Sequence, residues 1–125
     1  LIYSTALPPA VIGSIDAALD LVPTMDRERA ELAQKADSLR RQLQALGFDT
    51  GASSTQIIPV IVGREEEALA LSNWLESRGI LATAIRPPTV PPGRSRIRIS
   101  LSARHTGEHL QQLVEAFSSW ARKGA

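Results

Sequence analysis

Apolar residues recur at helical spacing in four segments of the chain. One stripe, spaced alternately by four and three residues, consists of Leu32, Ala36, Leu39, Leu43 and Leu46. It predicts a helix over residues 26–46, with Gly47 at its end. Similar stripes predict a helix over residues 65–78 and a last helix that begins at an N-cap, Thr106. Residues 10–22 also read as a helix, but apolar residues cover most of its sides, so this helix needs an extensive partner surface.

Three other segments have the pattern of strands. Residues 56–62 are rich in β-branched side chains, and Pro59 among them indicates an edge strand or a bulge. A second strand is expected over residues 80–85. Residues 95–101 alternate strictly, and this pattern predicts a half-buried strand with Arg96, Arg98 and Ser100 on its outer face. Four prolines between residues 86 and 93 make that segment a stiff, extended loop.

The expected order is helix, helix, strand, helix, strand, strand, helix. An α+β fold buries these stripes most simply, with a small three-stranded, mainly antiparallel sheet covered on one face by helices. The length of 125 residues fits one compact domain, and 43% hydrophobic with 22% charged residues is an ordinary globular composition.

Charge and cysteine content exclude several kinds of partner and site. A net charge of +1 lacks the one-signed field typical of proteins that bind nucleic acid or membrane surfaces, so neither partner is expected. No apolar window is long enough to cross a membrane. The sequence contains no cysteine, which removes disulfides and thiolate metal sites and is compatible with a cytoplasmic location.

Arginines gather where acidic residues are absent. No Asp or Glu occurs between Glu76 and Glu108, whereas five arginines of this stretch are Arg86, Arg94, Arg96, Arg98 and Arg104. Guanidinium groups on a strand beside a rigid loop can bind a carboxylate or phosphate in bidentate geometry, and Arg98 is the best single candidate. The alternative is a solvated sheet edge without a ligand.

Other candidates for catalysis are weak. His105 and His109 have no further ligand to complete a metal set, so we expect no metal and assign them capping or surface roles. The hydroxyl groups of Ser4, Thr5 and residues 53–55 have no base nearby in the sequence and fit turns or caps.

Three strings carry a family resemblance. They are Ala84-Ile85-Arg86-Pro87-Pro88-Thr89-Val90-Pro91-Pro92-Gly93, then Arg96-Ile97-Arg98-Ile99-Ser100-Leu101-Ser102 with His105-Thr106, and the opening Ile2-Tyr3-Ser4-Thr5-Ala6-Leu7-Pro8-Pro9-Ala10. Together they closely resemble the C-terminal domain of α-oxoamine synthases, pyridoxal-phosphate (PLP) enzymes of fold type I, and specifically the 8-amino-7-oxononanoate synthases of biotin biosynthesis.

The resemblance implies a function and site residues. It implies a homodimeric PLP-dependent acyltransferase that condenses L-alanine with a pimeloyl thioester and releases carbon dioxide. It implies that Arg98 holds the amino-acid carboxylate, that Thr89 contacts substrate and that Arg86 lies near the substrate entrance. Ser4 and Thr5 match the segment that reaches the cofactor phosphate of the neighbouring subunit.

The chain also departs from that family. The family's cofactor lysine precedes the point at which this sequence starts, and the two lysines here, Lys35 and Lys123, do not match it. We therefore expect residues 1–24 to lead from a missing large domain through an interdomain helix, and residues 25–125 to form the small domain. The 125 residues alone should bind no PLP and be non-catalytic. The alternative, from a different functional class, is a stand-alone anion-binding or protein-interaction domain.

Overall fold

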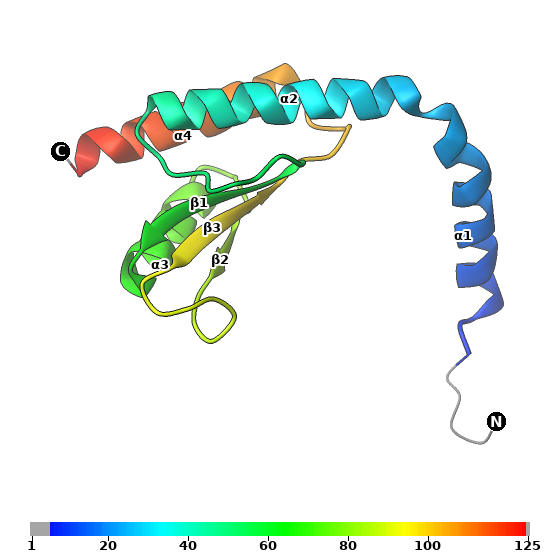
Figure 1. Ribbon diagram of the computed structural model, residues 1–125, viewed down its shortest axis with the longest axis horizontal. Coiled ribbons are helices and arrows are strands. Elements are labelled where there is room, and N and C mark those ends of the chain that lie inside the picture. The colour runs from blue at the N-terminus through cyan, green and yellow to red at the C-terminus, as the bar shows by residue number, and fades with distance from the viewer. Residues whose placement is uncertain (1–5, 125) are drawn as a thin grey trace.

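A computed structural model describes residues 6–124, which form four α-helices and one small sheet. Figure 1 shows their arrangement. In chain order the elements are α1 (Pro9–Leu21), a 3-10 turn η1 (Val22–Thr24), α2 (Asp26–Ala45), β1 (Ile57–Gly63), α3 (Glu65–Glu76), β2 (Thr83–Ile85), β3 (Ser95–Ser100) and α4 (Gly107–Lys123). The predicted α+β class and element order are confirmed.

The sheet has the strand order β1-β3-β2, and both pairings are antiparallel. Strand β1 is thus an edge strand, as Pro59 indicated. The backbone N–H of Ile61 donates to the carbonyl of Asp49 at 2.8 Å, on the outer side of β1. Because N–H groups of alternate residues point to the same edge, the nitrogen of Pro59 also faces outward, where β3 requires no donor from it.

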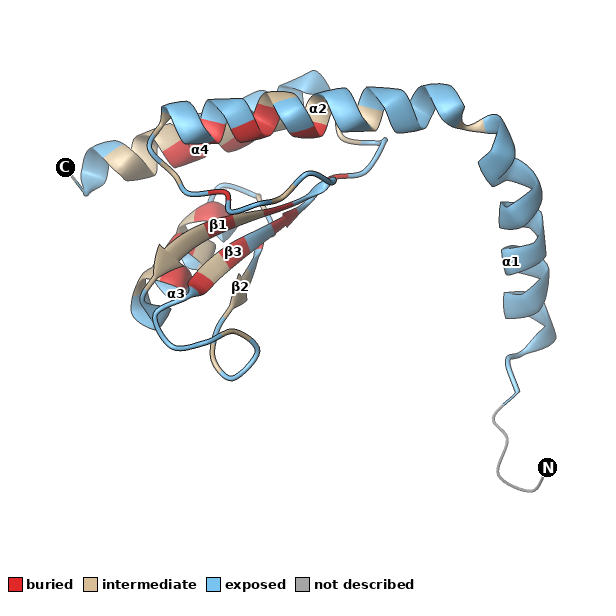
Figure 2. Cartoon of the chain, in the orientation of Figure 1, coloured by how far each residue is buried: buried red, intermediate tan, exposed pale blue. Residues whose placement is uncertain are grey.

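One face of the sheet and three helices enclose the core. The core cluster consists of Ala36, Leu39, Leu43, Ile58, Val60, Leu71, Leu75, Ala82, Ile97, Ile99, Leu101, Leu113, Ala116 and Phe117. Buried residues lie on the sides of α2, α4 and the strands that face one another (Figure 2). Phe117 of α4 also packs edge-on against Phe48, with 5.0 Å between the ring centroids. The helices therefore leave the opposite face of the sheet uncovered.

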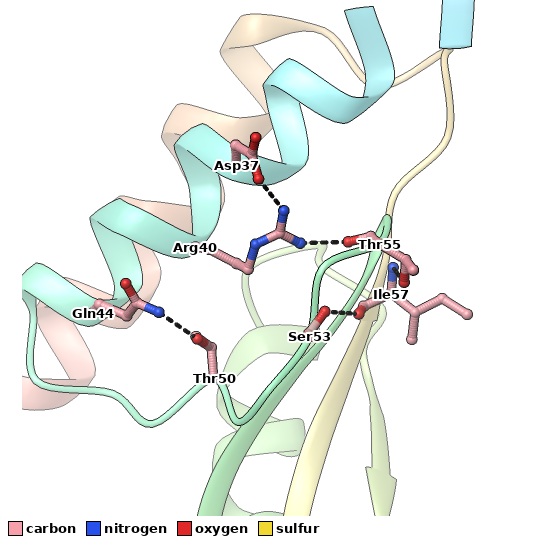
Figure 3. A network of polar contacts seen from close by, with 7 residues as sticks. All are labelled: Asp37, Arg40, Gln44, Thr50, Ser53, Thr55 and Ile57. Carbon is pink, nitrogen blue, oxygen red and sulfur yellow. Dashed lines mark hydrogen bonds and ion pairs between the residues drawn. The ribbon is translucent and has the colours of Figure 1, made fainter. Parts of the chain in front are cut away.

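Helix α2 is tied to the connection before β1 by side-chain hydrogen bonds (Figure 3). The guanidinium group of Arg40 is buried, pairs with Asp37 and donates to the carbonyl of Thr55 at 2.5 Å. One turn later, Gln44 Nε2 donates to the buried hydroxyl of Thr50 at 2.8 Å. These contacts satisfy buried polar groups and position the start of β1 against α2.

Helix α1 stands apart from the sheet and the other helices (Figure 1). Each residue from 6 to 24 is exposed, including the large apolar side chains of Val11, Ile12, Ile15 and Leu19. Within the described residues no helix is long and apolar enough to cross a membrane. The apolar surface of α1 is thus not covered by the rest of the described chain.

The second strand is shorter than predicted. We expected a strand over residues 80–85, but β2 begins only at Thr83. The residues before it bind α3 instead: the N–H of Ile80 donates to the carbonyl of Leu75 at 3.0 Å, and Ser72 Oγ donates to the carbonyl of Ala82 at 2.9 Å. These hydrogen bonds tie residues 80–82 to α3, and pairing with β3 starts only at Thr83.

Candidate functional site

The uncovered sheet face carries a row of outward-pointing residues from β3. Ile97 and Ile99 point into the core, so Arg96, Arg98 and Ser100 lie on the other face, as the alternation predicted. The antiparallel register sets Arg98 between Pro59 of β1 and Thr83 of β2. Arg98 is exposed, and neither neighbour carries a charge. The candidate site is therefore centred on Arg98.

The two arginines of this row differ in their surroundings. Arg96 is half-buried, and its Nε donates to the carbonyl of Arg94 at 3.0 Å, which holds the side chain toward the loop. The guanidinium group of Arg98 has neither a hydrogen bond nor an ion pair with any of the described residues. An exposed guanidinium group with no internal carboxylate remains available for an anion from outside.

A proline-rich loop joins β2 to β3 at one end of the sheet (Figure 1). Its peptide bond between Pro87 and Pro88 is cis, and the N–H of Thr89 donates to the carbonyl of Arg86 at 3.0 Å. Gly93 has a φ of 76°, a left-handed conformation that favours glycine. Thr89 is exposed on this loop, beyond the end of β3 that carries Arg96, and Arg98 lies two residues further along the strand.

The other predicted contact residue of the loop already has a partner. Arg86 forms an ion pair with Glu65, at 2.6 Å between guanidinium nitrogen and carboxylate oxygen, and both side chains are nearly half exposed. Glu65 belongs to the acidic first turn of α3. Residue spacing does not predict this pair, because the two residues are far apart in the chain and belong to different elements.

The remaining predicted site residues, Ser4 and Thr5, lie outside the described residues. The two histidines bind backbone N–H groups: Nδ1 of His105 accepts from the N–H of Ser102 at 2.9 Å, and Nδ1 of His109 accepts from the N–H of Thr106 at 3.1 Å. Thr106 and His109 thereby complete the capping box of α4, whereas His105 closes a turn before this helix. The predicted capping role is confirmed for His109.

The chain's two lysines lie away from the uncovered sheet face. Lys35 Nζ donates to the carbonyl of His105 at 2.9 Å, and Lys123 Nζ lies 4.9 Å from the ring centre of Trp74. PLP enzymes bind their cofactor covalently through a lysine. The residues present therefore do not fit PLP by themselves, whereas the Arg98 side of the sheet fits a carboxylate.

Comparison with known proteins identifies the family of this chain. Residues 1–117 match the family model described as aminotransferase class I and II. The chain is 58% identical over 122 residues to an 8-amino-7-oxononanoate synthase of Gluconacetobacter diazotrophicus, an alignment that covers 98% of this chain and 31% of that protein. The chain thus spans about 31% of the length of the curated relative, and the family resemblance of its motifs is confirmed.

Solved structures share the fold. A serine palmitoyltransferase from S. paucimobilis with bound PLP and myriocin has a TM-score of 0.90 and 27% identity, over 97% of this chain and 31% of that one. An 8-amino-7-oxononanoate synthase from Francisella tularensis has a TM-score of 0.81 over 98% of this chain and 36% of that one. At 23% identity, the second comparison concerns the fold alone.

Proposed function

Because the chain belongs to the aminotransferase class I and II family, we propose that it is the small-domain part of an 8-amino-7-oxononanoate synthase. Residues 25–125 form the small domain in this proposal, and residues 1–24 lead into it from a large domain through α1. The exposed apolar surface of α1 supports this division, since a helix of that kind requires a partner surface. The coverage of 31% of the relative's length leaves room for a large domain.

The whole enzyme would condense L-alanine with a pimeloyl thioester and release carbon dioxide and the thiol carrier. PLP, when bound to the large domain, would supply the electron sink for the decarboxylative step. The contribution of this chain is to bind and orient the substrate. Arg98 would hold the alanine carboxylate through two parallel N–H···O bonds, and its exposed, unpaired guanidinium group is the observation that carries the proposal.

The other site residues have supporting roles. Thr89, exposed on the proline-rich loop, would contact the substrate, and Arg86 would lie near the entrance, positioned by Glu65. Ser4 and Thr5 would reach the cofactor phosphate of a second subunit, so the active enzyme would be a homodimer. In this proposal the enzyme acts in the cytoplasm, where its substrates and cofactor are found.

The chain alone would not catalyse this reaction, because neither Lys35 nor Lys123 is placed to bind PLP covalently. Adding PLP to the 125-residue chain should produce no saturable visible absorbance band. A band that is lost when one of the two lysines is replaced by arginine would contradict the proposal.

The decisive experiment determines the coding sequence upstream of Leu1. We expect a glycine-flanked lysine within that region, and the complete protein should release carbon dioxide from L-alanine only when a pimeloyl thioester is present. A start codon directly before Leu1 would instead support a stand-alone anion-binding domain.

A further inference from the structure

A pocket of about 330 Å³ opens beside residues 80–82, ahead of the pairing of β2 with β3. It lies between that segment, the end of β3 and the first turns of α4. Its walls are largely aliphatic and include Ile80, Leu81, Ala82, Leu101, Leu110 and Leu113. Leu81 is 91% exposed and lies at the rim of the pocket. The volume is at the lower end of the roughly 300–1,000 Å³ range of small-molecule pockets.

His105 and His109 line the same pocket, and their tautomers follow from the hydrogen bonds. Nδ1 of each ring accepts a backbone N–H, from Ser102 and from Thr106. A backbone N–H can only donate, so Nδ1 carries no proton and the neutral ring is protonated at Nε2. Each imidazole therefore has one remaining ring group, an Nε2–H donor.

This tautomer disfavours a metal ion. A metal ligated by Nε2 would require the proton at Nδ1, and that would break the hydrogen bonds from both backbone N–H groups. Among the described residues no group of three or more His, Cys, Asp or Glu side chains could hold a metal ion. The rings are thus better suited to donate hydrogen bonds than to ligate a metal.

The backbone of β3 adds a third donor to the pocket. The N–H of Leu101 donates to the carbonyl of Gln56 at 3.0 Å, on the β1 side. Successive N–H groups of a strand point to opposite edges, so the N–H of Ser100 points to the edge where β2 has already ended. Ser100 also lines the pocket.

We propose that this pocket binds a small aliphatic carboxylate. The donors of His105, His109 and Ser100 have no acidic neighbour among the described residues that line the pocket, so they match an acceptor with negative charge. The aliphatic walls match a hydrocarbon chain. The pocket uses neither Arg98 nor Thr89, and the proposal is independent of the proposed function.

The test is a titration of the 125-residue chain, labelled with ¹⁵N, at about pH 8, where ordinary imidazoles are neutral. Sodium octanoate is the probe. We expect saturable shifts of the Nε2 resonances of both histidines and of the Ser100 amide. Octanol, which has the same chain but no charge, and acetate, which has the charge but no chain, should each bind at least roughly tenfold more weakly.

Two variants remove the donors. His105→Ala and His109→Ala carry no side-chain donor, and each should still fold, because each loses a single exposed hydrogen bond to the backbone. Each should weaken octanoate binding roughly tenfold, and Arg98→Ala should leave it unchanged. Unchanged affinity in both histidine variants, or equal affinity for octanol and octanoate, would overturn the proposal.

A second ligand, pimelate, tests whether this pocket is separate from the Arg98 site. Pimelate carries a second carboxylate, which the aliphatic end of the pocket does not favour, so we expect octanoate to bind more tightly. Tighter binding of pimelate that is lost in Arg98→Ala would overturn the independence of this pocket from the Arg98 site.

Discussion

Pro59 of β1 lies directly opposite Arg98 of β3, on the sheet face that the helices leave uncovered. Side chains at opposite positions of an antiparallel pair have Cβ atoms about 4.5–5.5 Å apart. The stem of Arg98 therefore emerges beside a rigid, uncharged ring, and Thr83 occupies the position on its other side. This arrangement places the unpaired guanidinium group between two uncharged neighbours.

The first prediction concerns Arg98 in the complete enzyme. Arg98→Ala should lower kcat/KM for L-alanine roughly thirty- to a thousand-fold, since a charge-assisted bidentate contact in a partly closed site contributes about 2–4 kcal/mol. Arg98→Lys should restore little of this loss, because a point charge cannot reproduce the planar fork. Steady-state kinetics with varied L-alanine measure the effect.

Arg96→Ala is the matched control on the same strand face. Its guanidinium group already donates to the carbonyl of Arg94, so the effect on L-alanine kinetics should be milder. Equal losses in both variants would indicate a diffuse electropositive patch. Loss of folding in Arg98→Ala alone, measured by chemical denaturation, would show a structural role and contradict the carboxylate assignment.

The second prediction concerns two buried hydroxyl groups. Ser95 Oγ is buried and has no hydrogen-bond partner among the described residues, so Ser95→Ala should change the free energy of unfolding by less than about 0.5 kcal/mol or raise it. Thr50 is equally buried, but its hydroxyl accepts from Gln44. Thr50→Val should therefore cost about 1–2 kcal/mol in urea unfolding. Equal costs would show that Ser95 Oγ has a partner in solution.

The third prediction concerns the start of α4. His109→Glu should keep the capping box and place a negative charge in the first turn, where the helix dipole favours it, and so raise the unfolding free energy by about 0.3–1 kcal/mol. His109→Ala should lower it by about 0.5–1 kcal/mol through the lost hydrogen bond to Thr106. Thermal melts measure both changes, and a loss of stability in His109→Glu would refute the capping role.

The fourth prediction concerns the apolar surface of α1. Ile15 and Leu19 are 47% and 65% exposed, so the 125-residue chain should self-associate through this helix. Replacing both by glutamine should shift sedimentation toward the monomer with little change in the unfolding free energy of the remaining domain. Sedimentation of the unchanged chain as a monomer at high concentration would contradict this prediction.

Local patterns were sufficient to predict most of the fold. The apolar stripe on residues 26–46 predicts only a helix, and the alternation of residues 95–101 predicts only a strand. The structure has α2 and β3 at these places. Residues 80–82 have the composition of a strand, but Ser72 and Leu75 of α3 bind their backbone. These contacts depend on where α3 ends relative to the sheet, which periodicity does not reveal.

The site was only partly predictable for a similar reason. Alternation and local charge were enough to place Arg98 on the open face, whereas the roles of Thr89 and Arg86 came from family resemblance. The pair of Arg86 with Glu65 and the pocket beside His105 both depend on contacts between separate elements. The spacing of residues along the chain predicts neither the pair nor the pocket.

The outward-facing nitrogen of Pro59 has a consequence for how the chain behaves when concentrated. An exposed edge strand can recruit strands from other molecules and so begin fibre growth. On β1, proline offers no donor at that position, and the segment at Asp49 already occupies the edge at Ile61. Strand β2, at the opposite edge, has only three residues. Assembly of the chain through α1 should thus give amorphous or closed oligomers, and cross-β fibres should be disfavoured.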